Sequence, residues 1–195
     1  MSKIRKTTQY LMPVSRKKPG ALDYDIYPVH DLGDGTVSSD FSELAARIPE
    51  RGTVIVDGYV GVRFDEFVSS LNEALSAVGK TALWWSVDSA LKSPAEIDKM
   101  IEPFLGGDDP LFGYRASLEL KDFFDGDKLA SIKADASAPL NIIYGIGASL
   151  AGWEGTLIYL DIPKNEIQFR SRAGSVRNLG AAAPDAPKKM YKRFY

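Results

Sequence analysis

The sequence predicts an α/β fold in three layers, in which helices flank a mainly parallel sheet of about five strands. Two observations carry this prediction. Short apolar, β-branched runs of the kind that form buried strands alternate with segments whose apolar residues recur at helical spacing. Glycine turns separate several of these runs, and strands that alternate with helices favour crossover connections in a parallel sheet. The length of 195 residues suits one domain with a sizeable core.

The N-terminal region is expected to contain an irregular arm, an edge strand and a short helix. Residues 1–22 are basic and interrupted by prolines, which predicts no regular structure. Over 24–30, Tyr, Ile and Val alternate with polar residues, as in a short edge strand. Either Ser39 or Asp40 can cap a helix that runs to Arg47.

The clearest strand lies at 53–57, an uninterrupted β-branched run that ends in an acid and a glycine. A tight loop over 58–61 follows it. The next segment, 64–78, places its apolar residues on one helical face and is stopped by Gly79. Residues 81–86 are predicted to form the next strand.

The second half of the chain continues the alternation. A helix over 93–104 begins with a Ser-Pro pair, which suits a capped N-terminus. Further helices are expected over 127–133 and 164–172. Apolar runs at 140–144 and 156–161 predict two more strands.

The expected organisation has three parts: a basic arm (1–22), the α/β domain (23–174), and a basic tail or linker toward a further C-terminal domain (175–195). The Ala- and Pro-rich segment 181–187 is typical of a linker or extended arm. Both ends of the chain are basic, whereas the middle is strongly acidic. The basic ends could meet phosphate groups or lie along the acidic body.

Composition excludes several kinds of site. Without cysteine there is no disulfide, thiolate nucleophile or Cys-ligated metal, and His30 is the sole histidine, so we expect no metal centre. The basic stretches lack a repeated aromatic–basic pattern, so we expect no nucleic-acid partner. The apolar runs are too short to span a bilayer and no signal core follows the N-terminus, so we expect a cytoplasmic protein without a membrane partner.

The loop after strand 53–57 decides which chemistry this fold can perform. In parallel sheets such a loop binds phosphate, because backbone N–H groups and a helix N-terminus face the anion. A working loop is G-x-x-x-x-G-K-[ST], whereas the chain from Gly58 is Gly-Tyr-Val-Gly-Val-Arg-Phe-Asp. Phe64 and Asp65 therefore replace the lysine and the Mg²⁺-binding hydroxyl, and Arg63 could supply a substitute charge. The candidate phosphate-binding residues of this degenerate loop are Gly58, Tyr59, Gly61 and Arg63.

Four later motifs follow the loop. They are Trp-Trp-Ser-Val-Asp ending at 88, Asp-Phe-Phe-Asp-Gly-Asp-Lys-Leu at 122–129, Asn-Ile-Ile-Tyr-Gly at 141–145, and Leu-Asp-Ile-Pro at 160–163 with Arg170 and Arg172 beyond it. Their order resembles that of uridine-kinase-type phosphate-loop domains. The resemblance implies a nucleoside-kinase-like P-loop fold, with Asp88 at the position of the catalytic aspartate and Arg170 and Arg172 as lid charges. The chain departs from this family's pattern at the positions that bind the nucleotide, which argues against kinase activity.

A second resemblance covers nearly the whole chain. The stretches 54–61 and 157–174, with the ending Tyr-Lys-Arg-Phe-Tyr, look like the N-terminal segment of bacterial class I mannose-6-phosphate isomerase-like proteins. A cupin domain follows that segment in those proteins, and its zinc is held by histidines and carboxylates. The resemblance therefore implies a cupin partner domain and a place in carbohydrate metabolism, with the zinc site outside these residues.

Three functions remain open from the sequence. The first is a non-catalytic kinase-like domain, without cofactor, that binds a phosphorylated small molecule or packs on an isomerase domain. The second is an active ATP- and Mg²⁺-dependent nucleoside or sugar kinase with Asp88 as base. The third is a ligand-free interaction module that docks through its basic ends.

Overall fold

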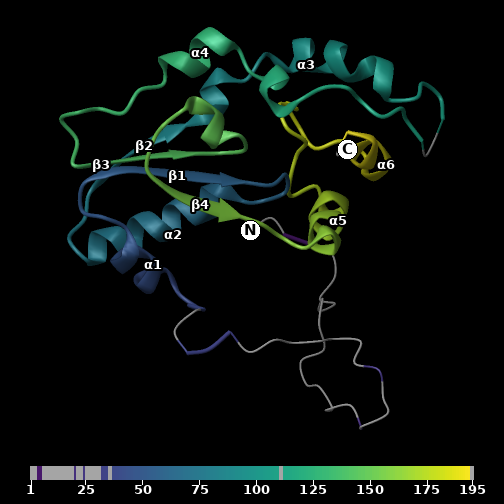
Figure 1. Ribbon diagram of the computed structural model, residues 1–195. Helices are drawn as coiled ribbons and strands as arrows, with labels where there is room; N and C mark the ends of the chain where they lie inside the picture. The colour runs from purple at the N-terminus through teal and green to yellow at the C-terminus, as the bar shows by residue number, and fades with distance from the viewer. Residues whose placement is uncertain are drawn as a thin grey trace.

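A four-stranded sheet lies at the centre of the molecule between two layers of helices (Figure 1). The computed structural model describes residues 4–5, 20, 24, 32–34, 37–109 and 112–193. The strands are β1 (Gly52–Gly58), β2 (Ala82–Ser86), β3 (Leu140–Tyr144) and β4 (Thr156–Leu160). All pairings are parallel and the order is β2-β3-β1-β4. The predicted three-layer α/β architecture with a parallel sheet is confirmed.

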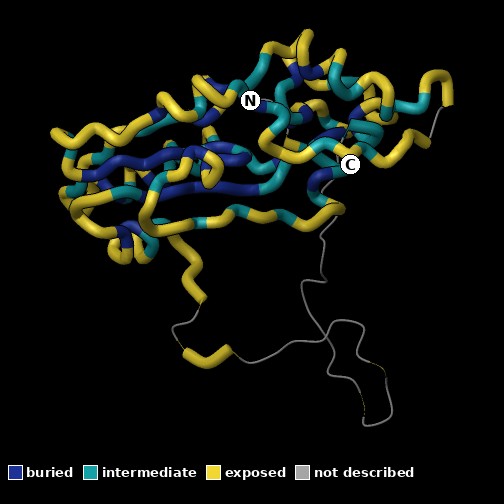
Figure 2. Tube along the Cα trace, turned by 45° about the horizontal axis from the view of Figure 1, so that its top comes forward, coloured by how far each residue is buried: buried dark blue, intermediate teal, exposed yellow. Residues whose placement is uncertain are grey.

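Strand β1 is central because both of its faces are covered. Val54, Ile55 and Val56 point alternately to the two faces, and at most 4% of any of these side chains is exposed. Such a strand must be apolar throughout rather than alternating, which is the pattern that identified it in the sequence. In Figure 2 the central strands form the dark blue, buried middle of the molecule.

Helices α1 (Phe41–Arg47) and α2 (Phe64–Ala77) cover one face of the sheet. The Asp40 side chain accepts the N–H of Glu43 at 3.0 Å and so caps α1, as the sequence predicts. At the other end of α1, the Lys80 ammonium donates to the carbonyls of Ala45 and Ile48 at 2.8 and 2.5 Å. A cation at this position also interacts favourably with the helix dipole.

Short helices cover the opposite face. They are the 3₁₀ turns η1 (Val87–Ala90) and η4 (Ala148–Ala151) and the helix α4 (Gly126–Ser131), which enclose a second core with Phe124 and Ile143. The Trp85 indole donates to Asn141 at 3.0 Å and packs edge-on against Trp153. Trp85 is therefore used in packing the sheet rather than in binding.

The remaining helices lie beyond the C-terminal ends of the strands (Figure 1). They are α3 (Pro94–Ile101), continued by η2 (Glu102–Phe104), then η3 (Leu120–Phe123), α5 (Lys164–Ala173) and α6 (Pro187–Lys192). Residues after Gly174 fold back onto the body, because Val176, Asn178 and Met190 are buried. The charge pattern left open that the basic C-terminal end lies along the body, whereas the sequence did not predict α6.

The Arg193 guanidinium fixes the C-terminal segment to the body. It lies 2.8 Å from an Asp98 carboxylate oxygen on α3 and 3.2 Å from Asp185. The expected arm over 1–22 and the expected edge strand over 24–30 fall almost entirely outside the described residues. The four described strands account for the rest of the expected sheet.

Candidate functional site

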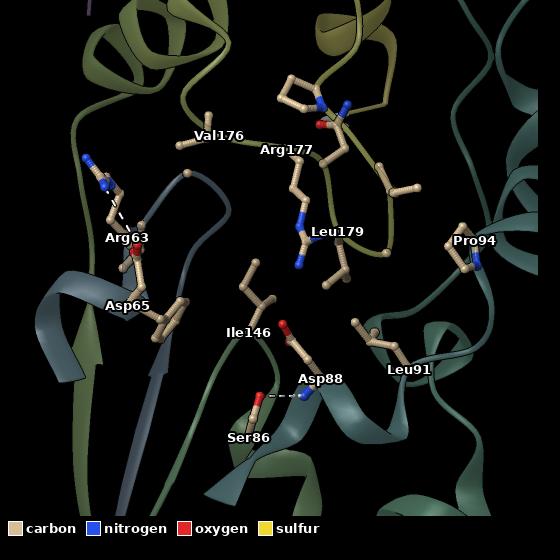
Figure 3. A pocket seen from close by; sticks show the side chains of 18 of the residues that line it. Arg63, Asp65, Ser86, Asp88, Leu91, Pro94, Ile146, Val176, Arg177 and Leu179 are labelled. Atoms are coloured by element: carbon tan, nitrogen blue, oxygen red, sulfur yellow. Dashed lines mark hydrogen bonds and ion pairs between the residues drawn. The ribbon is translucent and has the colours of Figure 1, made fainter. Parts of the chain in front are cut away.

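A cavity of about 770 Å³ opens at the C-terminal ends of β1, β2 and β3 (Figure 3). The chain leaves β1 toward β2 on one side, and leaves β3 toward β4 on the other. The loops after β1 and β3 therefore diverge, and in parallel sheets this divergence creates the crevice that binds ligands. Four segments line the cavity: 61–65, 86–94 in part, 144–146 in part, and 174–184.

Two charged side chains, Asp88 and Arg177, face each other across the cavity (Figure 3). Asp88 follows β2 in the first turn of η1, and Arg177 lies in the segment that folds back after α5. Within the described residues, no group hydrogen-bonds to the Asp88 carboxylate, and none hydrogen-bonds or ion-pairs with the Arg177 guanidinium.

The electrostatics of Asp88 follow from this position. The cavity leaves its side chain accessible to water, but the surrounding protein displaces enough solvent to raise the pKa of the carboxyl, while the Arg177 charge opposes that shift. The two groups interact through the open cavity without forming an ion pair. Both groups line the cavity, where a ligand can reach them.

An apolar wall completes the cavity. Phe64 at the start of α2, Tyr144 at the end of β3 and Ile146 in the next loop contribute to it. The Tyr144 ring is held edge-on by Trp84, with ring centroids 6.1 Å apart. No described residue hydrogen-bonds to the Tyr144 hydroxyl. The cavity thus combines a rigid aromatic surface with polar groups that have no protein partner, which is the usual composition of a small-molecule site.

Bonds within the protein occupy part of the glycine loop beside the cavity, including its first two N–H groups. The Gly58 N–H donates to its neighbour Asp57 at 2.7 Å, and the Tyr59 N–H donates to the last carbonyl of β4 at 3.0 Å. The Gly61 carbonyl accepts from the Arg170 guanidinium at 2.8 Å. A phosphate-binding loop instead needs several free N–H groups that converge on the anion.

Arg63 lines the cavity, but its guanidinium is engaged by two carboxylates of α2. It lies 2.9 Å from Glu66 and 3.6 Å from Asp65. Arg170 bonds to Glu166 at 3.0 Å in addition to Gly61.

The structure therefore brings only some of the predicted site residues together. Gly61, Arg63 and Asp88 line the cavity, whereas Gly58, Tyr59, Arg170 and Arg172 do not. The Arg172 side chain instead donates to the Tyr191 hydroxyl of α6 at 3.1 Å.

A buried carboxylate, Asp57, fixes the loop after β3. Only 6% of this residue is exposed. Besides the Gly58 N–H, it accepts the N–H groups of Gly147 and Ser149 at 2.8 and 3.0 Å and the Ser149 hydroxyl at 2.5 Å. Because Ile146 belongs to this loop, Asp57 holds one wall of the cavity in place.

Arg177 is the site residue that sequence reasoning missed, because it lies in the segment expected to be a tail. One signal was available: Gly174 ends α5 with φ +66°, a left-handed turn that redirects the chain. Among the described residues, no cluster of three or more His, Asp or Glu side chains is placed to hold a metal ion. Within the same part of the chain, no helix has the length and apolar character needed to cross a membrane.

The fold and the cavity define a three-layer α/β domain with a pocket at the C-terminal edge of a parallel sheet. Residues 40–195 match a family described as a domain of unknown function, DUF8485, and the chain belongs to that family. No curated protein matches the chain.

One similar solved structure is the crystal structure of a protein from Silicibacter sp. TM1040, provisionally named a fructose transport system kinase. It is 19% identical, covers 68% of this chain and 80% of its own, and has a TM-score of 0.43. A likeness at this level does not extend to function. The similarity to mannose-6-phosphate isomerase-like proteins stays a prediction.

Proposed function

We propose that this chain is a kinase-like domain, by the order of its motifs, that binds an anionic small molecule such as a phosphate ester without transferring phosphate. The observation that carries the proposal is Arg177, a guanidinium that lines the cavity and has no partner among the described residues. Guanidinium groups bind phosphate and carboxylate through paired, charge-assisted hydrogen bonds. The loop expected to hold phosphate is less suited, because its N–H groups at Gly58 and Tyr59 already have acceptors.

The charges around the cavity also favour an anion. Its lining contains three basic residues and two acidic ones. The Arg63 charge is offset by Asp65 and Glu66. The Lys92 ammonium donates to the Asp122 carbonyl at 2.7 Å and also acts electrostatically on the Glu96 and Asp125 carboxylates outside the lining. Arg177 is therefore the cation of the lining that forms no ion pair or hydrogen bond with a described residue and is available to an anion.

The chain lacks the side chains that usually support phosphoryl transfer. Phe64 and Asp65 stand where lysine and a hydroxyl would hold the phosphates and Mg²⁺. Asp88 is accessible from the cavity, but a base alone cannot position a phosphoryl donor. A cupin partner domain and a cytoplasmic location remain parts of the proposal.

Isothermal titration with cyclohexyl phosphate tests the proposal. We expect saturable binding that weakens about tenfold or more in Arg177→Ala, the equivalent of one charge-assisted hydrogen bond. Arg172→Ala is the matched control, since it removes the same charge from outside the cavity, and its affinity should equal that of the wild type.

Three outcomes would contradict the proposal. Equal affinity in wild type and Arg177→Ala would show that the anion binds elsewhere. Mg²⁺-dependent turnover of ATP by the wild-type chain would establish the active kinase instead. Absence of both phosphate binding and turnover would also contradict the proposal and favour the third function, a ligand-free interaction module.

A further inference from the structure

We infer that the ligand of this cavity is a polyhydroxylated anion, and that Asp88 selects it by accepting hydrogen bonds from its hydroxyl groups. This inference rests on the proposed function: Arg177 holds the anionic group, and Asp88 recognises what the anion is attached to.

The first argument is the unused hydrogen-bonding capacity of Asp88. Its backbone N–H is held by the Ser86 hydroxyl at 3.3 Å, which fixes the start of η1, but its carboxylate has no described donor. An ionised carboxylate only accepts hydrogen bonds. Water can reach Asp88 in the open cavity, and a ligand that displaces this water without replacing its hydrogen bonds loses binding free energy. A ligand that fills the cavity must therefore bring donors to Asp88.

The second argument concerns which donors these are. Ammonium and hydroxyl groups both donate to carboxylates. The cations Lys92 and Arg177 already line the same cavity. A ligand ammonium would add a third cation and weaken the binding of the ligand's anionic group. Neutral hydroxyls satisfy Asp88 without this repulsion.

The third argument is the apolar part of the cavity lining. Phe64, Tyr144 and Ile146 present an apolar surface suited to the C–H face of a hydroxylated ring. The Tyr144 hydroxyl, which has no described partner, can exchange a further hydrogen bond with such a ring. A volume of about 770 Å³ accommodates a ring that carries a phosphate.

A matched pair of ligands tests the inference. Inositol 1-phosphate and cyclohexyl phosphate share the six-membered ring and the phosphate and differ in the ring hydroxyls. We expect the wild-type chain to bind inositol 1-phosphate at least about tenfold more tightly. In Asp88→Ala this ratio should fall markedly toward one, because the ring hydroxyls of inositol 1-phosphate then lack the Asp88 acceptor.

The ratio separates hydroxyl recognition from charge, since removal of the Asp88 charge favours both phosphates alike. Glu73→Ala is the control: it removes an exposed carboxylate of α2 that does not line the cavity. Its ratio should match that of the wild type. Asp88 makes no side-chain hydrogen bond with a described residue, so we expect Asp88→Ala to fold, and its thermal melting curve checks this.

Three other outcomes would each overturn all or part of the inference. Equal binding of the two phosphates by the wild type would overturn the inference and leave the proposed function intact. A preference that persists in Asp88→Ala would overturn the role of Asp88. If neither of the two phosphates binds, both the proposed function and this inference are overturned.

Discussion

The carboxylate of Asp57 provides the strongest prediction about stability. One of its oxygens accepts the N–H groups of Gly58 and Gly147, and the other accepts the N–H and hydroxyl of Ser149. In Asp57→Asn one oxygen becomes an NH₂ donor. The best orientation turns that NH₂ toward Ser149, whose hydroxyl can rotate to accept it but whose backbone N–H then has no acceptor.

The expected cost follows from these changes. Two charge-assisted bonds become neutral at about 1 kcal/mol each, and the partly buried Ser149 N–H loses its partner at about 1 kcal/mol. Asp57→Asn should therefore lower the free energy of unfolding by about 3 kcal/mol. For a chain of this size that corresponds to a decrease in Tm of roughly 6–12 °C.

Urea unfolding followed by tryptophan fluorescence measures this change, because the chain has three tryptophans. Asp135→Asn is the control: that exposed carboxylate accepts two hydrogen bonds from Ser137 within a single turn. We expect it to cost less than about 1 kcal/mol. A free energy of unfolding for Asp57→Asn within about 0.5 kcal/mol of the wild type would refute the assigned role of the carboxylate.

Three further predictions concern single contacts. Gly58→Ala places a methyl group 2.6 Å from the Leu160 carbonyl oxygen, and should destabilise the chain by about 1–3 kcal/mol in urea unfolding; unchanged stability would contradict that contact. Lys80→Met removes the cation that caps α1 and should cost about 1–3 kcal/mol in the same assay, with a loss below about 0.3 kcal/mol arguing against the cap. Burial raises the pKa of Asp88 above its ordinary value of 3.8, so the wild type loses stability as the pH rises from 3.8 through that higher pKa. Asp88→Asn should therefore be more stable than the wild type at pH 7 and equally stable below pH 3.8. A difference in stability that stays constant across pH would contradict the raised pKa.

The sequence identified those elements whose signals are local. Asp40 caps α1, and Ser93 and Glu96 form the reciprocal capping box at the start of α3. Gly79 ends α2 with φ +74°. Each signal lies within a few residues of the boundary that it sets, so the boundaries could be predicted without knowledge of the fold.

The candidate site was predicted in part. Asp88, Gly61 and Arg63 lie at the cavity because loops that follow parallel strands meet at one edge of the sheet. The engagement of Arg63 by Glu66 could have been anticipated from their helical spacing, but the bond from Arg170 to Gly61 joins distant parts of the chain. The spacing within a motif does not reveal such contacts.

The C-terminal segment shows why composition misleads. Its prolines, alanines and basic residues are typical of a linker, and none of them indicates where the segment packs. The decisive observations are that Val176 and Met190 are buried and that Gly180 packs against Ile97 of α3. Without that burial, Arg177 could not have been placed in a site.

The position of the cavity wall has a consequence for synthesis of the protein. The last strand, β4, is complete at Leu160, and the sheet can form once it has left the ribosome. The cavity needs the segment 174–184 as well. The proposed binding is therefore acquired after the sheet is complete, and a chain released at Gly174 would keep all four described strands while lacking Arg177 and one wall of the cavity. Proteolysis or premature termination in this segment would separate folding from ligand recognition.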